Sequence, residues 1–158
     1  MPYPKIGNLA PNFKLPDQDG NIVELKSFRG KSALIVYFYP KAMTPGCITQ
    51  ACGLRDSKTA IDEHGVIVLG ISPDPISRLS RFIEKHDLNF TLLSDENHAV
   101  ADQFGVWGRK KFMGKEYDGI HRISFLIDKG GLVEKVFDKF KTKDHHETVI
   151  NYLTALTA

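Results

Sequence analysis

The chain has 158 residues, the usual size of one domain with a single core, so we expect one domain over residues 1–158. Its 21 Lys and Arg residues nearly balance 19 Asp and Glu residues, and basic residues occur only in short groups, which excludes a nucleic-acid or anionic-membrane binder. No stretch approaches the roughly 18 apolar residues of a membrane span, and we find no signal-peptide pattern, so we predict a cytoplasmic protein.

The predicted elements begin with a β-hairpin. Residues 11–28 alternate apolar and polar side chains around Asp19 and Gly20, and we expect this hairpin to decorate the edge of a sheet. The continuous apolar run ALIVYFY, residues 33–39, predicts a central strand buried on both faces. A helical pattern over residues 45–63 and a second buried strand, VIVLGIS, complete a β-α-β unit.

The second half of the chain continues the alternation of strands and helices. We predict a strand over residues 90–93, a hairpin formed by ISFLID and LVEKVFD, and three helices over residues 76–86, 98–104 and 145–156. The segment over residues 107–119 is predicted to be a long loop. The whole pattern is typical of an α/β sandwich, with helices flanking a central mixed β-sheet.

Both cysteines, Cys47 and Cys52, lie in the stretch YPKAMTPGCITQACG. Thr44 is a good helix N-cap and Pro45 suits the first helical position, so Cys47 falls at the third position of the predicted helix. A thiolate there would face unpaired N–H groups and the positive helix end, just beyond the carboxyl end of a central strand, where α/β sheets bind ligands. The structural alternative is a buried cysteine behind an ordinary cap.

A helix terminus alone stabilises a nearby anion by only about 0.3 to 1 kcal/mol. We therefore expect the Thr44 hydroxyl to donate a hydrogen bond to the sulfur of Cys47, and a cation from elsewhere in the chain to approach it. A guanidinium fits this role best, because it is always charged and carries several donors.

Pro40, Thr44 and Cys47 match the Pro-x-x-x-Thr-x-x-Cys motif of the peroxiredoxins, and the sequence resembles their peroxiredoxin Q branch, also called bacterioferritin comigratory protein. The resemblance extends over nearly the whole chain, through VLGISPD, FTLLSDE, FGVWG and DGIHRISFLID. It implies a thioredoxin-like fold with extra N-terminal strands. It also implies an antioxidant thiol peroxidase that reduces hydrogen peroxide and organic hydroperoxides without a cofactor.

The same resemblance assigns roles to single residues. It makes Cys47 the peroxidatic nucleophile, Thr44 the hydroxyl that bonds sulfur and peroxide, Pro40 the shield of the pocket, and Arg122 the active-site arginine. Without the resemblance, Arg122 is equally well explained as a solvated side chain on a sheet face. Gln50 departs from the pattern, because many peroxiredoxins carry Glu there.

Cys52 resembles the resolving cysteine of part of this branch, although it could instead be a core residue of the helix. The implied cycle forms a Cys47–Cys52 disulfide, which thioredoxin or glutaredoxin reduces, in a monomeric protein. In an ideal helix the two Cα atoms are about 8.6 Å apart, and a disulfide tolerates about 7 Å, so the helix must unwind first. Gly53 weakens the helix by about 1 kcal/mol relative to Ala and favours that unwinding.

Other chemistries are less well supported by the sequence. The six histidines are scattered or adjacent on one helix, so we predict no metal site. A thioredoxin-type dithiol oxidoreductase is an alternative, but it usually carries Cys-x-x-Cys. A non-enzymatic binding protein that retains the fold is another, and Cys47→Ser would leave its function intact. The segment over residues 107–119 could rim a pocket, dock a reductase, or simply pack as a loop.

Overall fold

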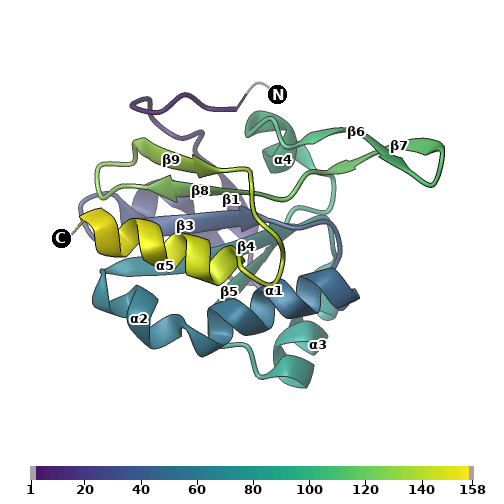
Figure 1. The fold of residues 1–158 in the computed structure, drawn as a ribbon, viewed down its shortest axis with the longest axis horizontal. Helices are drawn as coiled ribbons and strands as arrows, with labels where there is room; N and C mark the ends of the chain where they lie inside the picture. The colour runs from purple at the N-terminus through teal and green to yellow at the C-terminus, as the bar shows by residue number, and fades with distance from the viewer. Residues whose placement is uncertain (1–2, 157–158) are drawn as a thin grey trace.

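The computed structural model describes residues 3–156 and contains a five-stranded mixed sheet in the order β5-β4-β3-β8-β9 (Figure 1). The central strand β3 (Ala33–Phe38) runs parallel to β4 (Val66–Ser72), which runs parallel to β5 (Thr91–Ser94). On its other side β3 pairs antiparallel with β8 (Ile123–Ile127), and β8 pairs with β9 (Val133–Phe137). The predicted α/β sandwich with a mixed sheet is confirmed.

The helices lie close to their predicted positions, with one difference. They are α1 (Pro45–Asp56), α2 (Lys58–Glu63), α3 (Ile76–His86), α4 (Ala99–Gln103) and α5 (His145–Leu156), with a 3₁₀ helix η1 over Leu25–Phe28. The single helix predicted over residues 45–63 is wrong, because Ser57 leaves the helical conformation with φ −102° and ψ 6°. Its N–H bonds the carbonyls of Gly53 and Leu54 at 3.2 Å, which tightens the last turn of α1.

The predicted N-terminal hairpin is confirmed. β1 (Lys14–Pro16) pairs antiparallel with β2 (Ile22–Glu24), and Asp17 closes the turn by accepting hydrogen bonds from the N–H groups of Asp19 and Asn21. A bridge from Asp17 to Leu93 places the turn against β5, so this hairpin does decorate a sheet edge.

The long loop predicted over residues 107–119 is wrong, because this segment is a second hairpin. β6 (Trp107–Phe112) pairs antiparallel with β7 (Lys115–Ile120), and it projects from the body of the molecule in Figure 1. Met113 and Gly114 form the turn with φ of 52° and 81°, the positive values of a two-residue hairpin turn. The sequence does not show an alternation of apolar and polar residues here, because most side chains of both strands are polar and exposed. The apolar residues Phe112 and Met113 at the tip are exposed as well.

Successive side chains of β3 point to opposite faces of the sheet and pack into two separate cores. Leu34, Val36 and Phe38 pack with α4 and the N-terminal segment, while Ile35 and Tyr37 pack on the opposite face beneath α1, α2, α3 and α5. Cys47 belongs to this second core. None of the helices within residues 3–156 is long and apolar enough to cross a membrane.

Candidate active site

Cys47 lies where local sequence chemistry predicted it, at the third position of α1. Thr44 is the N-cap in an extended conformation, and Pro45 begins the helix. The first-turn N–H groups of Gly46 and Cys47 have no carbonyl partner within the helix, so they point their partial positive charge toward this end. Cys47 is only 1% exposed, and both cysteines are free thiols. The helix start therefore offers a buried thiol in a setting that favours an anion.

The loop that leads into α1 is fixed by a buried carboxylate. Asp74 Oδ2 accepts hydrogen bonds from the N–H of Ala42 and from Ser72 Oγ, both at 2.7 Å. Arg78 donates to the Ala42 carbonyl at 2.8 Å and forms an ion pair with Asp74 at 3.3 Å. These two residues hold the turn before Thr44, where Met43 has a φ of 65°. Sequence reasoning missed them, since only the SPD motif around Asp74 marks the place and Ala42 lies 32 residues away.

The Thr44 hydroxyl donates its hydrogen bond to a different acceptor from the expected one, the sulfur of Cys47. It donates to the Lys41 carbonyl at 2.8 Å and makes no capping bond to the helix. A hydroxyl has one proton, so in this conformation the bond to Lys41 takes the donor that was expected to reach the sulfur of Cys47. Its oxygen keeps a free lone pair, and rotation of the side chain would exchange the partner.

Arg122 supplies the cation at the first turn of α1. It lies just before β8, and its Nη1 donates to Gln50 Oε1 at 3.0 Å. A Cβ built on Gly46 would come within 3.0 Å of Arg122 Nη2, so the guanidinium lies directly on the residue before Cys47. Gln50 is fully buried and holds the guanidinium with a neutral acceptor, which leaves its positive charge uncompensated by this bond.

Cys52 shares the continuous helix α1 with Cys47 and is partly exposed. The residue after it, Gly53, has a packing role that the sequence did not show. The ring of His146 on α5 lies so close that a Cβ on Gly53 would collide with its Nδ1 atom. The Cys52 end of α1 is thus held down by close contact with α5.

The mostly apolar layer beneath α1 contains the polar rings of Tyr37 and His145. Burial raises the pKa of Tyr37 well above its ordinary value, with smaller contributions from Tyr39 and Cys47. Burial also lowers the pKa of His145 to about 3, and its Nε2 shares a hydrogen bond of 2.7 Å with Ser124 Oγ. Both rings are neutral near pH 7, so neither adds a charge beside Arg122.

A cavity of about 340 Å³ lies between the β6–β7 hairpin and the loops that precede α1 and α3. Pro40, assigned by resemblance as the pocket shield, lines it together with Lys41, Pro73, Trp107, Lys110, Tyr117, Asp118, Gly119 and Ile120. The cavity therefore opens beside the segment that carries Thr44 and Cys47, and its outer wall is the hairpin.

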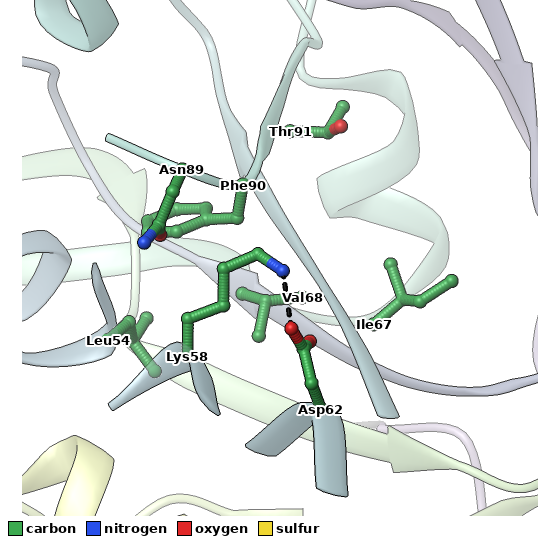
Figure 2. Close-up of a pocket in the computed structure, with 8 residues that line it drawn as sticks. All are labelled: Leu54, Lys58, Asp62, Ile67, Val68, Asn89, Phe90 and Thr91. Atoms are coloured by element: carbon green, nitrogen blue, oxygen red, sulfur yellow. Dashed lines mark hydrogen bonds and ion pairs between the residues drawn. The ribbon is translucent and has the colours of Figure 1, made fainter. Parts of the chain in front are cut away.

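A second cleft, of about 230 Å³, lies at the other end of the sheet (Figure 2). It is bordered by Ile67 and Thr91 at the amino ends of β4 and β5, whereas Cys47 follows the carboxyl end of the parallel strand β3. Lys58 and Asp62 bridge its rim at 2.6 Å. This cleft is not part of the Cys47 site.

Within residues 3–156, no three His, Cys, Asp or Glu side chains are grouped to hold a metal ion.

Comparisons with known proteins agree with this architecture. The profile of the AhpC/TSA family matches residues 6–136. The putative peroxiredoxin bcp of Haemophilus influenzae is 64% identical over 151 residues, which cover 96% of this chain and 97% of that protein. Peroxiredoxin Bcp of Escherichia coli is 64% identical over 149 residues, covering 94% and 95%. The bacterioferritin comigratory protein of Xanthomonas campestris, studied for alkyl peroxide reduction, is 31% identical with a TM-score of 0.85 over 92% of each chain.

The fold and these relatives define an enzyme of the peroxiredoxin class, a peroxidase with a thioredoxin-like fold. The chain belongs to the AhpC/TSA family, and its similarity to peroxiredoxin Bcp proteins covers nearly its whole length. The resemblance inferred from the motifs is confirmed.

Proposed function

We propose that this chain is a thiol peroxidase that reduces hydrogen peroxide and organic hydroperoxides through Cys47. The observation that carries the proposal is the Arg122 guanidinium, packed on Gly46 in the same helical turn as the buried thiol. A buried cysteine that served only as a small hydrophobe would have no need of a cation there. The cavity beside Pro40 adds room for an organic substituent, and the Xanthomonas campestris relative was studied for alkyl peroxide reduction.

The reaction follows from the charges at the site. The Cys47 thiolate attacks one peroxide oxygen, an S–O bond forms as the O–O bond breaks, and the products are a sulfenic acid and an alkoxide or hydroxide that takes a proton from solvent. Negative charge moves from sulfur to the leaving oxygen during this step. Arg122, the first-turn N–H groups and a rotated Thr44 hydroxyl are donors suited to that charge, and Pro40 shields the pocket from water.

Cys52 completes the cycle as the resolving residue. Its thiol condenses with the Cys47 sulfenic acid to give a disulfide and water, and thioredoxin, or alternatively glutaredoxin, reduces the disulfide by thiol–disulfide exchange. Both cysteines lie in one intact helix, so α1 must unwind and lose its contact with His146 before the bond can form. Two free thiols in the reduced form also suit the reducing cytoplasm, where a monomeric single-domain protein of this kind would act as an antioxidant.

The test compares the wild type with Cys47→Ser and Cys52→Ser in a peroxide-consumption assay driven by a thioredoxin system. Cys47→Ser should abolish turnover. Cys52→Ser should consume one equivalent of peroxide to form the sulfenic acid, and a second equivalent should oxidise it to the sulfinic acid unless an external thiol rescues it. Mass spectrometry after one equivalent of hydrogen peroxide should find a Cys47–Cys52 crosslinked peptide only in the wild type.

Other outcomes would support the alternatives. Rapid reduction of an insulin-type disulfide without peroxide consumption would indicate a dithiol oxidoreductase. Full function in Cys47→Ser would indicate a non-enzymatic binding protein. An intermolecular dimer as the sole oxidised product would contradict the role given to Cys52.

A further inference from the structure

Lys110 differs from its basic neighbours on strand β6. Arg109 and Lys111 are exposed, whereas Lys110 is half-buried and points the other way, toward the body of the protein. Its Nζ donates to the carbonyl of Ile120 at 2.8 Å. Its aliphatic stem crosses Gly119, where a Cβ would lie only 3.3 Å from Lys110 Cδ. The side chain is thus held in one direction by a hydrogen bond and by the absence of a side chain on Gly119.

The ammonium group lies in the cavity beside Pro40, within electrostatic range of the site. Burial lowers the pKa of Lys110, the Arg122 charge lowers it further, and Cys47 opposes this shift. The other charged or titratable side chains that line the cavity are Lys41 on the body and Tyr117 and Asp118 on β7. Asp118 is exposed and forms its ion pair with Arg109. It therefore does not neutralise the positive charge of Lys110.

The carbonyl that Lys110 holds lies two residues before Arg122. The neighbouring segment is fixed twice more, since His121 N–H donates to the Val106 carbonyl at 2.8 Å and His121 Nε2 lies 3.1 Å from the Arg109 carbonyl. The base of the β6–β7 hairpin is therefore bonded to the stretch that delivers the guanidinium to α1. Any loosening of this base would move Arg122 relative to Gly46.

We propose that Lys110 is a positioning residue of the peroxidase reaction, which fixes the Ile120 carbonyl ahead of Arg122 and adds a second positive charge in the cavity beside Pro40. The inference rests on the proposed function. In the peroxide step, negative charge leaves the sulfur and develops on the departing oxygen as the S–O bond forms and the O–O bond breaks. A nearby ammonium stabilises that charge without taking part in any bond.

The test uses Lys110→Met, Lys110→Arg and the matched control Lys111→Met, which removes the same charge from the exposed neighbouring position. The second-order rate constant of the reduced protein with hydrogen peroxide is measured in a single turnover by stopped flow, so the reductant does not matter. Lys110→Met should lower it roughly tenfold, because the variant removes a positive charge that stabilises the developing negative charge. Lys110→Arg should stay within about threefold of the wild type and Lys111→Met within about twofold, because both keep a cation at position 110.

The dependence of the peroxide rate constant on pH distinguishes an effect of the Lys110 charge from a purely structural role of its side chain. The rate of the wild type should fall at alkaline pH, beginning below the ordinary range of lysine because burial lowers the pKa of Lys110, while Lys110→Arg should lack this limb. Equal rates for Lys110→Met and Lys111→Met, or the same alkaline limb in the wild type and Lys110→Arg, would overturn the inference. A wild type that does not consume peroxide at all would instead overturn the proposed function.

Discussion

Arg122 and Gln50 are joined by a 3.0 Å hydrogen bond that spans 72 residues of sequence and ties the start of β8 to the second turn of α1. The acceptor is a neutral amide, and its Nε2 has no partner among the described residues. A glutamate at this place would form an ion pair and offset part of the guanidinium charge. The glutamine keeps Arg122 oriented while its charge stays directed at the helix start.

Arg122→Met should slow the reaction with peroxide by about 10²- to 10³-fold, the usual effect of removing one donor that stabilises a developing negative charge. The single-turnover rate constant measures this, and circular dichroism establishes that the fold is kept. Arg81→Met is the control, because Arg81 is an exposed arginine on α3. If Arg122→Met unfolds the protein, Arg122 is a structural residue and its catalytic role fails.

Thr44→Val should slow the peroxide step far more than Thr44→Ser. Serine keeps the hydroxyl that now donates to Lys41 and can rotate toward the sulfur, whereas valine has nearly the same shape and no donor. The loss of one such donor typically costs about 2.7 to 4 kcal/mol of transition-state stabilisation. Rates that are equal in the two variants would exclude a catalytic role for the hydroxyl.

Gly53→Ala should destabilise the reduced protein, although alanine favours a helix by about 1 kcal/mol over glycine. The added Cβ would collide with the His146 ring, and such overpacking typically costs about 1 to 3 kcal/mol. Urea unfolding under reducing conditions measures the change. Combining Gly53→Ala with His146→Ala should recover stability, with a coupling energy of about 1 kcal/mol or more.

Gly130→Ala is the matched control for this pair, because its Cβ would meet its nearest neighbour at an ordinary distance of 3.4 Å. Additive effects of Gly53→Ala and His146→Ala would show that the two residues do not press on one another. In that event the low helix propensity of glycine would be the only effect of Gly53 on the stability of α1.

Acid should destabilise the protein through His145. Its pKa is about 3 in the folded chain because of burial, against about 6.5 in an unfolded chain, so the unfolded state binds more protons between these values. The free energy of unfolding should therefore fall as pH drops below about 6.5, by at most about 1.4 kcal/mol per pH unit from this group. Urea unfolding at several pH values measures the slope.

His145→Gln should flatten that slope, because an amide does not titrate in this range. The control is His98→Asn, which removes a more exposed histidine that has a carboxylate partner in Asp102. A slope that is unchanged in His145→Gln would assign the acid sensitivity to other groups.

Local chemistry made much of the site predictable. Thr44 and Pro45 are sufficient to predict where α1 begins, and that start alone places Cys47 at the third helical position. The apolar runs of β3 and β4 likewise predict buried central strands. The arginine of the site needed the family resemblance, since a charged residue before a strand has no local signature of its role.

The features that escaped prediction depend on contacts between distant segments. The bond from Ala42 to Asp74 and the contact of Gly53 with His146 each join residues with no periodic or motif relationship. The sequence predicts Gly53 to be a weak point of the helix, because it shows the missing side chain but not the His146 ring that lies in its place. The β6–β7 hairpin was missed because its exposed strands lack an apolar face.

Of the two cores, only the one that contains Cys47 includes residues of α1, the helix that unwinds and refolds in the proposed cycle. The core that packs against α4 contains no residue of α1, so in the proposed cycle we expect it to stay assembled on the sheet and to serve as the template on which α1 refolds. Rewinding is then a local folding event on a surface that already exists, and a helix of this length relaxes within about a microsecond. If α1 unwinds in each turnover as proposed, only the core that contains Cys47 has to open, and the sheet with its other core keeps the native topology.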